Sequence, residues 1–457
     1  MIVPLFRRTL RGCLALLLSP LPLPLASAQS PSGPPVPPVC LDVTAVDSAE
    51  DQQPGTNTQQ QPKAGETKYP PDLLDGTLSA LGDLEEDDSP HTSRFRTALE
   101  NWFAWKAKLQ KEHGFSFSAS WGVLWQNYTN SRIAQPNAVG SKVTINLAYD
   151  LFKHNQPSAF SVDMAVEDRR ALGTSLPPLQ AGIGAGSIVP TAATWGQFDI
   201  GITQLYVRQS LFQNHFQYTV GKIFAPNYVD AYPFFDDNRQ FLSQQFSTNT
   251  TIQSPLRGFG GVAAWFPTEG GEYLKAGMFT SNSSDTGSTV ADFFSKNQHF
   301  YMLEAGLSSL ARTATAIQTR GPTDSDNIHV TGWYRDSTNV SPRSYGFAFN
   351  ANYKVDERFL WFLRGGWSKN FLANGTVTGG LGWRPPKERS DLLGAGFGWT
   401  HPSSGAQRSQ YTAETFYRLQ VIQNFAITPD IQLVLHPTLN PRVNTIWAFS
   451  LRGRVVF

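Results

Sequence analysis

The sequence predicts an all-β fold, a closed transmembrane antiparallel β-barrel of about 16 strands with a short N-terminal helix. Three observations lead to this prediction. From Phe115 onward, apolar and polar residues alternate with a period of two, which puts them on opposite faces of strands. An export signal opens the chain, and the closing segment is a strand with a terminal aromatic residue. The mean hydropathy of the 457 residues is −0.28, too polar for a helical membrane protein but compatible with alternating strands.

Residues 1–28 are expected to be a secretory signal peptide. Arg7, Arg8 and Arg11 precede an apolar stretch, and Ala26–Ala28 supplies the small residues of a cleavage site. Beyond this segment no run of about 18 apolar residues occurs, so no membrane-spanning helix is expected. For a barrel, export of this kind predicts the bacterial outer membrane.

Residues 29–93 are expected to form a disordered, Pro- and Gln-rich acidic extension in the periplasm. This stretch holds 12 Asp and Glu against two Lys, and it lacks hydrophobic periodicity. Such a segment buries too little apolar surface to offset its chain entropy. Cys40 is the one cysteine left after signal removal, so no internal disulfide is expected in the mature chain.

Residues 94–113 are predicted to be an amphipathic helix. Apolar side chains recur at roughly helical spacing, and Gly114 is a plausible stop; the apolar residues are Phe95, Leu99, Trp102, Phe103 and Leu109. One interpretation is a helix that plugs or seals a mouth of the barrel, and the other is a helix that packs loosely outside it. Some docking is expected, because an exposed apolar stripe would be a liability.

Residues 114–457 are assigned to the barrel. In residues 143–150, for example, Val, Ile, Leu and Tyr alternate with Thr, Asn, Ala and Asp. Candidate strands, from which the number 16 comes, lie near 115–127, 142–151, 158–168, 198–210, 215–224, 257–266, 272–280, 298–308, 327–335, 343–353, 358–368, 377–384, 390–400, 411–420, 427–436 and 446–457. Segments of this length suit tilted strands that cross a hydrocarbon layer.

A soluble sandwich also alternates, so it is the main competitor for the fold. Export, the large number of strands, and aromatic residues near strand ends favour the membrane. In lipid, every backbone N–H and C=O needs an internal partner, so the sheet is expected to close on itself. Short connections such as 352–357 and long ones such as 169–197, 225–256 and 281–297 suit the two ends of such a barrel.

Four segments together resemble the carbohydrate-selective porins of the OprB type. They are Leu109–Asn127, Gln204–Asp230 with its Gly-Lys-Ile-Phe-Ala-Pro run, Arg257–Phe279, and Ile427–Phe457 with its Arg-x-Arg ending. The likeness spans about 109–457. It implies a porin that lets small carbohydrates diffuse passively through a polar lumen lined by Arg and Glu. It also implies outer-membrane lipid as a partner, with no nucleic acid and no cofactor, and leaves a homo-oligomer open.

The polar side of the alternation supplies candidate channel residues. Sugars need hydrogen-bond donors and acceptors with an occasional aromatic platform. The candidates are Asp163, Glu167, Arg208, Lys222, Asp230, Trp333, Arg335, Arg364, Glu414, Arg418, Asp430, Arg452 and Arg454. Lys222 and Asp230 match the family's segment, and either contact solute at a constriction or form a salt bridge or turn that fixes the loop at 225–256.

Three alternatives remain open. The segment 94–457 carries 32 Lys and Arg against 24 Asp and Glu, which suits an anion-preferring porin for phosphate or organic acids. An exported enzyme on a β scaffold is less favoured, because no nucleophile elbow, no HExxH and no metal-spaced His cluster occurs; Asp236 and Asp237 are interpreted as a solvated turn. A structural or adhesive barrel closed by the helix is the third.

The terminal Phe457 resembles the assembly signal of outer-membrane barrels, which predicts recognition by the barrel assembly machinery. Removal of Phe457 is therefore expected to lower the yield of assembled barrel in the outer membrane. The yield is measured as the fraction of protein that migrates as a folded species on unheated SDS gels. An undiminished yield would contradict this role of the C-terminal residue.

Overall fold

The computed structural model describes residues 93–153, 158–310, 326–356, 358–385, 391–405, 407–422 and 424–457. All of them belong to one of the two compact units of the chain, Thr67–Phe457. The predicted signal peptide, and the predicted extension except for its last residue, lie outside the described residues.

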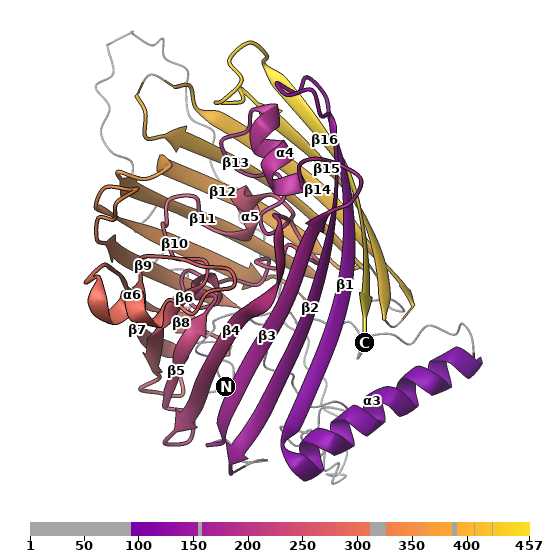
Figure 1. Ribbon diagram of the computed structural model, residues 1–457, viewed down its shortest axis with the longest axis vertical. Coiled ribbons are helices and arrows are strands. Elements are labelled where there is room, and N and C mark those ends of the chain that lie inside the picture. The colour runs from indigo at the N-terminus through magenta and orange to yellow at the C-terminus, as the bar shows by residue number, and fades with distance from the viewer. Residues whose placement is uncertain are drawn as a thin grey trace, which may run out of the picture. The chain divides into compact units, whose positions relative to one another are not determined.

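The described residues form one closed antiparallel barrel of 16 strands, which confirms the predicted fold (Figure 1). Each strand pairs with its sequence neighbours, and β1 closes the sheet against β16, with Trp121 opposite Val455 and Gln126 opposite Ser450. The strands are β1 Phe115–Tyr128, β2 Asn137–Phe152, β3 Phe160–Ala171, β4 Phe198–Leu211, β5 Phe216–Ile223, β6 Gly258–Trp265, β7 Glu272–Thr280, β8 His299–Ser308, β9 Asn327–Arg335, β10 Ser344–Lys354, β11 Phe359–Lys369, β12 Ala373–Trp383, β13 Leu392–Pro402, β14 Gln410–Ile422, β15 Phe425–Leu435 and β16 Thr445–Val456.

Two strands extend further than the alternation indicates. β2 begins at Asn137 rather than near 142, because its ladder with β1 continues up to the Asn127–Asn137 pair. β12 begins at Ala373 rather than near 377, because its glycines carry no side chains with which to display the period of two.

The apolar side of the alternation is on the outside of the barrel. In β16, Trp447, Phe449 and Leu451 are exposed, whereas the residues between them are buried inside. Large outward-facing side chains recur all round the sheet, among them Trp121, Trp125, Ile145, Tyr149, Leu205, Trp265, Leu303, Val330, Phe347, Leu363, Trp367, Val377, Phe397 and Ile431. The outer face of the barrel is therefore apolar, and its inner face is mostly polar. In a soluble sandwich the apolar face would instead be buried between the sheets.

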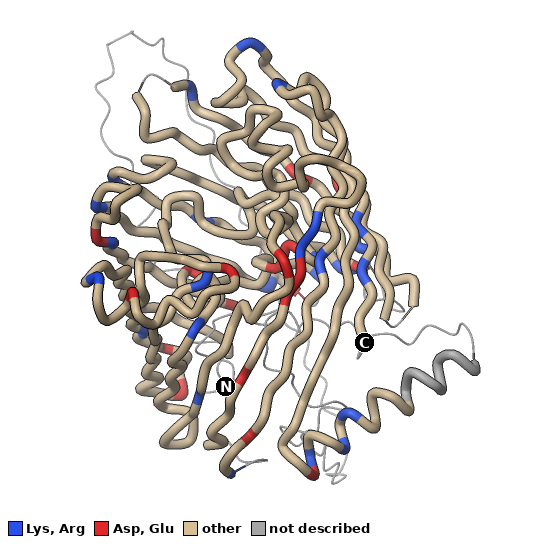
Figure 2. Tube along the Cα trace, viewed as in Figure 1, with Lys and Arg blue, Asp and Glu red and all other residues tan. Residues whose placement is uncertain are grey.

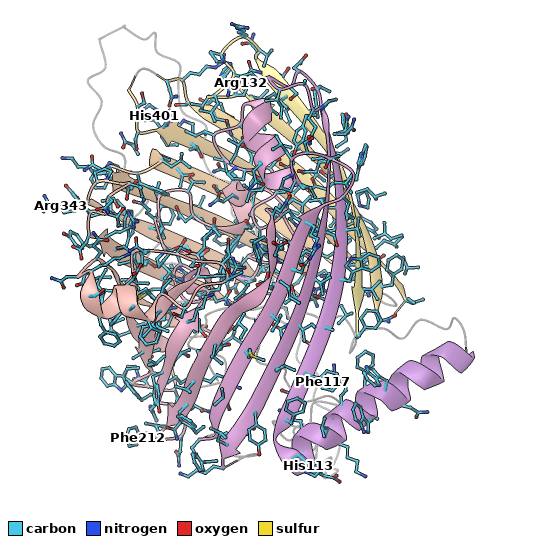
Figure 3. All side chains as sticks on the ribbon, in the orientation of Figure 1. His113, Phe117, Arg132, Phe212, Arg343 and His401 are labelled. Atoms are coloured by element: carbon cyan, nitrogen blue, oxygen red, sulfur yellow. The ribbon has the colours of Figure 1, made fainter. Side chains whose placement is uncertain are left out.

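The two mouths of the barrel differ in the length of their connections. The lower mouth, where β1 begins and β16 ends, has mostly short turns, although the connection 309–326 is longer. The upper mouth carries the long connections 172–197, 224–257 and 281–298. Figure 3 shows His113 and Phe212 at the lower mouth, and Arg132 and His401 at the upper one.

Five helical segments accompany the barrel within the described residues. Four lie in the long upper connections, namely α4 Pro178–Ala185, the 3₁₀ turn η1 Ala225–Asn227, α5 Gln244–Ser247 and α6 Val290–Ser295; the fifth, α3 Ser93–His113, precedes β1. None of the helices in the described part of the chain is long and apolar enough to cross a membrane.

Helix α3 lies outside the barrel wall, so of the two interpretations of this helix the structure supports packing outside the barrel and not a plug or seal. Trp102 and Trp105 pack edge-on against Phe117 of β1, with ring centroids 5.9 and 6.0 Å apart. Phe117 points outward, because its neighbour Ser118 is buried on the inner side. The predicted stop is confirmed: Gly114 has φ +67°, and its N–H donates to Gln110 O at 2.8 Å.

Leu363→Arg places a charge on the outward face near the middle of β11. We expect it to lower the free energy of unfolding in lipid vesicles by about 2–4 kcal/mol, the cost of a basic residue at mid-depth. Urea unfolding followed by tryptophan fluorescence measures this. Val340→Arg, in an upper connection at a residue 92% exposed, is the control. Equal stability of the two variants would contradict a lipid-facing belt.

Candidate functional site

The connection 224–257 between β5 and β6, here called the inserted loop, runs through the barrel interior. Almost all its residues are buried, and they bond to side chains on the inner face of strands far away in sequence. A surface connection would instead leave its polar backbone to water. Its contacts explain why this chain segment enters the barrel.

Asp230 is the first anchor of the inserted loop. Its carboxylate forms an ion pair with Arg364 of β11, and the other oxygen lies 3.0 Å from Nε2 of His329 of β9. Arg364 also donates to Asp230 O at 2.9 Å, and its guanidinium stacks 3.9 Å from the Tyr232 ring centroid. Asp230 has φ +51°, a conformation that Asp tolerates better than most residues. One loop residue thus joins two strands.

Glu304 of β8 extends this network beneath the loop. It accepts the Asp230 N–H at 2.9 Å and pairs with the fully buried Lys275 of β7 at 2.7 Å. The hydroxyls of Tyr273 and Thr331 donate to it at 2.8 Å each. Buried charges need such partners, because an unpaired ion away from water is costly. The network therefore fixes the loop against β7, β8, β9 and β11.

A second anchor holds the far end of the inserted loop against β14 and β16. The Glu414 carboxylate accepts the N–H groups of Leu242 and Ser243. The fully buried Arg452 donates to Asp237 O at 2.6 Å and to Gln240 O at 3.0 Å. In this anchor, charged side chains of the wall form hydrogen bonds with main-chain groups of the loop.

The connection 172–197 between β3 and β4 joins the same network. Thr194 donates its N–H to Asp237 Oδ2 at 2.6 Å and its hydroxyl to Oδ1, also at 2.6 Å. In turn, Lys142 donates to the Thr194 hydroxyl at 2.9 Å, and Arg169 to Thr194 O at 2.6 Å. The interpretation of Asp236 and Asp237 as a solvated turn is wrong, since both are buried inside the barrel.

Charged residues accumulate at mid-height of the barrel, beside β3 and β4 (Figure 2). Glu167 pairs there with Arg169 and with Arg257, the latter at 3.0 Å, and Arg257 also bonds Asp285 at 2.7 Å. Arg257 stacks over Phe224, 5.1 Å from the ring centroid. This cluster ties three connections of the upper mouth to one strand.

Aromatic side chains of the inserted loop form a buried cluster against β11–β14. Its members are Phe224, Tyr232, Phe234, Phe235, Phe241, Phe246, Leu360, Phe362, Leu392 and Phe416. Glycines on the wall make room for it: a Cβ on Gly382 would lie 2.4 Å from Phe234 Cζ, and one on Gly396 2.6 Å from Phe246 Cε1. Burial raises the pKa of Tyr232, whose hydroxyl donates to Phe246 O.

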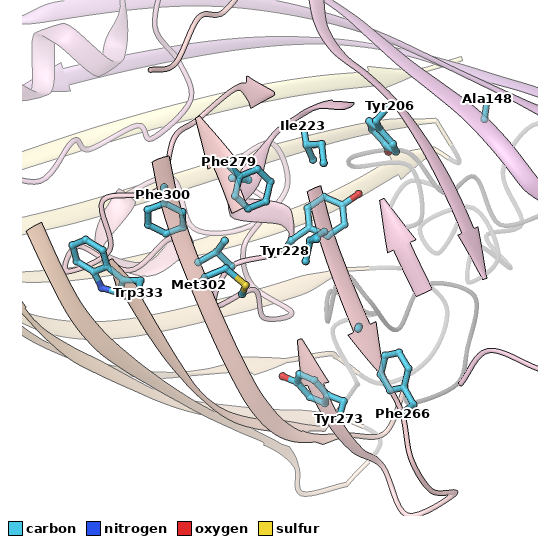
Figure 4. Close-up of a cluster of buried hydrophobic side chains, with 14 residues drawn as sticks. Ala148, Tyr206, Ile223, Tyr228, Phe266, Tyr273, Phe279, Phe300, Met302 and Trp333 are labelled. Carbon is cyan, nitrogen blue, oxygen red and sulfur yellow. The ribbon is translucent and has the colours of Figure 1, made fainter. Parts of the chain in front are cut away.

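A second apolar cluster lines the inner face of β4–β9, as Figure 4 shows. Tyr228 of the inserted loop packs among inward-facing residues such as Phe279, Phe300, Met302 and Trp333. Alternation predicted the inward position of Trp333 but not those of Phe279 and Phe300. The interior is thus closely packed along one side of the loop.

On the opposite wall, below the loop, a polar pocket remains open. It opens to solvent, and the space that it encloses is about 20 Å³, room for a water molecule. Its lining comes from β1, β2, β3, β16 and the inserted loop, and consists of Ser118, Ala119, Ser120, Lys142, Thr144, Asn146, Glu167, Asn238, Arg454 and Val456. Hydroxyl, amide and charged groups dominate this lining, and the buried Asn146 Oδ1 has no hydrogen-bond partner among the described residues.

All predicted channel residues on strands lie on the inward side. Asp163 pairs with Arg208 at 2.9 Å, and Lys222 donates to Ile202 O and Asp285 O at 2.8 and 2.9 Å. The others on strands are Glu167, Trp333, Arg335, Arg364, Glu414, Arg418, Asp430, Arg452 and Arg454. Lys222 and Asp230 were interpreted either as solute contacts at a constriction or as residues that fix the loop at 225–256. Their contacts favour the second interpretation, because both residues bond to connections of the upper mouth or to the wall.

Residues that matter for the interior were also missed. The strands of Lys275, Glu304 and His329 carry no motif that distinguishes these residues from other inward polar residues. Only the structure identifies them, because it places Lys275 and His329 beside Glu304. For the inserted loop a signal existed: residues 224–246 are dense in Phe and Tyr, which is unusual for a solvated connection. Among the described residues, no three His, Cys, Asp or Glu side chains gather in a way that would hold a metal ion.

Comparison with known proteins gives one family and a set of related folds. The sequence model for "Carbohydrate-selective porin, OprB family" matches residues 142–457. A high-pH structure of Pseudomonas putida OprB superimposes with a TM-score of 0.62 at 14% identity, covering 78% of this chain and 97% of that chain. At this identity the likeness concerns the fold. No curated protein matches this chain.

Two further structures are more distant. A low-pH structure of Pseudomonas putida OprB has a TM-score of 0.48 at 12% identity, with 78% of this chain and 97% of that chain covered. A mutant of the Rh. blastica porin has a TM-score of 0.44 at 12% identity, with 75% of this chain and 100% of that chain covered.

Asp230→Asn keeps a residue that tolerates the positive φ but removes the charge that pairs with Arg364. We expect the free energy of unfolding to fall by about 3–5 kcal/mol, because a buried cation loses its partner. We also expect noisier single-channel current, since the loop loses its anchor. Chemical unfolding and planar-bilayer recording measure the two effects.

Asp168→Asn is the matched control for this change. Asp168 pairs with Arg170, whose side chain is 57% exposed, so we expect a loss below about 1 kcal/mol. If both variants unfold alike, Asp230 does not anchor the loop.

Proposed function

Because the chain belongs to the carbohydrate-selective porin family OprB, we propose that it lets small carbohydrates diffuse passively across the bacterial outer membrane through the barrel interior. One observation carries this proposal: charged and amide side chains face the inside of a closed barrel whose outside is apolar. Such a barrel offers solutes a polar route through lipid. The family and the fold indicate a channel rather than an enzyme.

We place the solute path along the polar pocket wall rather than through the packed aromatic side. Ser118, Ser120 and Thr144 offer hydroxyls, Asn146 offers an amide oxygen without a partner among the described residues, and Lys142 offers an ammonium group. Sugar hydroxyls both donate and accept, so they match this mixture. Contacts of this kind are also weak enough individually to let a solute leave, which conduction requires.

The predicted channel residues then fall into two roles. Arg454 lines the pocket, and we assign it to the solute path. Glu167 lines the pocket too, but Arg169 and Arg257 hold its two carboxylate oxygens, so we assign it to holding the upper connections. Asp230, Arg364 and Glu414 hold the inserted loop, and we assign them to shaping that path from the side. A loop held by buried ion pairs gives the passage a fixed width.

An anion-preferring channel is the second candidate, and a specific observation favours it. Three interior cations have neutral oxygens as their hydrogen-bond acceptors: Lys222 and Arg452 donate to main-chain carbonyls, and Arg335 donates to Ser281 O and the Ser341 hydroxyl. Within the described part of the chain, their positive charge is therefore not cancelled by direct ion pairs. Rings of basic residues favour anions.

Purified protein in liposomes tests the first candidate. We expect swelling in isotonic sugar to be fast for pentoses and hexoses and slower for di- and trisaccharides, because the inserted loop narrows the path. Proteoliposomes that exclude all sugars while conducting ions would overturn the proposal. Reversal potentials under a KCl gradient decide the alternative: strong anion preference without current block by glucose or maltose favours the anion channel.

Arg454→Gln tests the assigned path. We expect sugar to block the ion current less strongly in this variant, because a donor on the pocket wall is shortened and uncharged. Arg170→Gln is the control, since Arg170 is exposed and pairs with Asp168. Sugar block that is the same in both variants and in the unmodified protein would remove Arg454 from the path.

A further inference from the structure

Helix α3 is held on the outside of the barrel by an aromatic cluster that the transport role does not use. The Trp102 and Trp105 rings lie 5.2 Å apart and both meet Phe117 of β1 edge-on. Phe117 also stacks on Phe115, with centroids 6.1 Å apart. The two tryptophans nevertheless remain 39% and 48% exposed, so the barrel covers only one side of them.

Helix α3 lies at the lower edge of the apolar outer face of the barrel. Phe115 of β1 is paired with Tyr149 of β2, and Tyr149 and Phe152 are exposed at the same lower mouth. Lys106 fixes the helix there, because its Nζ donates to Phe457 O at 3.2 Å and lies 4.9 Å from the Phe117 ring centroid. Aromatic residues at such a boundary occupy the level of the lipid headgroups.

The outer surface of α3 is basic. Its last two turns carry Lys106, Lys108 and Lys111 against one acid, Glu112, and so keep a positive balance. Lys108 is 68% exposed at its side chain and lies 3.8 Å from Glu112 in an exposed ion pair. Figure 2 shows blue positions following one another along this end of the helix, and Figure 3 places His113 at the lower rim. Tryptophans on one helix beside lysines are typical of helices that lie along an anionic membrane surface.

We propose that α3 lies in the headgroup layer of the leaflet at the lower mouth, where Trp102 and Trp105 enter the interface and Lys108 and Lys111 contact anionic phospholipid. The inference rests on the membrane placement of the barrel under the proposed function. It adds a lipid-binding element at the β1–β16 seam. A plug is ruled out as its role by the outward contacts with Phe117.

Spin labels in the full-length chain test the depth of α3, with Cys13 and Cys40 changed to Ser. A nitroxide is attached at Ala104→Cys, an exposed residue of the helix, after reconstitution into vesicles of phosphatidylcholine and phosphatidylglycerol. Leu363→Cys on the outer belt and Val340→Cys in an upper connection give the lipid and water references. We expect the ratio of oxygen to nickel-chelate accessibility at Ala104 to lie between the two references.

Three results would overturn the inference or its basis. A ratio equal to that of Val340 means a helix in water, and low accessibility to both reagents means a helix covered by protein, such as a second copy. Either result rejects the lipid contact and leaves the barrel in place. A water-like ratio at Leu363 would instead reject the membrane placement itself, and with it the proposed function.

Charge reversal tests the lipid chemistry. A basic residue near an anionic surface contributes about fivefold to its partitioning, so Lys108→Glu with Lys111→Glu is expected to move the Ala104 label toward the water reference in phosphatidylglycerol vesicles. Lys296→Glu with Arg343→Glu, two basic residues of upper connections, is the matched control and should leave the label unmoved. An unmoved label in both pairs would refute recognition of anionic lipid.

Discussion

Hydrogen bonding of the main chain in a medium without water is the constraint on which this structure depends. A strand in hydrocarbon has no solvent for its N–H and C=O groups, so every edge has to be paired. The pairing of β1 with β16, for example Gln126 opposite Ser450, removes the last two edges. Once the sheet is closed, the period of two separates an outer apolar face from an inner polar face.

The enclosed face then creates a second problem, that of buried charge. Wall arginines such as Arg364 and Arg452 are buried and need acceptors. The inserted loop provides them: the Asp230 carboxylate for Arg364, and the carbonyl groups of Asp237 and Gln240 for Arg452. Hydrogen bonds and ion pairs between their polar groups thus hold the inserted loop to the wall. The aromatic cluster around Phe241 fills the space between the two.

This arrangement gives the interior two different sides. On one side the wall holds the inserted loop, and on the other, along β1–β3 and β16, the wall borders the polar pocket. Side chains such as Glu304 and Lys275 are saturated by each other and by neighbouring hydroxyls, which leaves them little capacity for a passing solute. The wall around Asn146 and Arg454 borders empty space instead. The proposed passage along that wall would let a barrel that is largely filled still serve as a channel.

The sequence alone predicted the strands and their two faces, because alternation is local. Together with the export signal and the number of strands, it also predicted the inward position of residues such as Glu414 and Arg452. It also indicated the family through segments such as Gln204–Asp230. It could not determine which inward charges meet, because Asp230 and Arg364 are 134 residues apart and come together only after the barrel has closed. Tertiary contacts likewise determine that α3 packs on the outside of the wall and that the inserted loop enters the interior. Helical spacing and chain length are the same whether a segment packs inside a barrel or outside it.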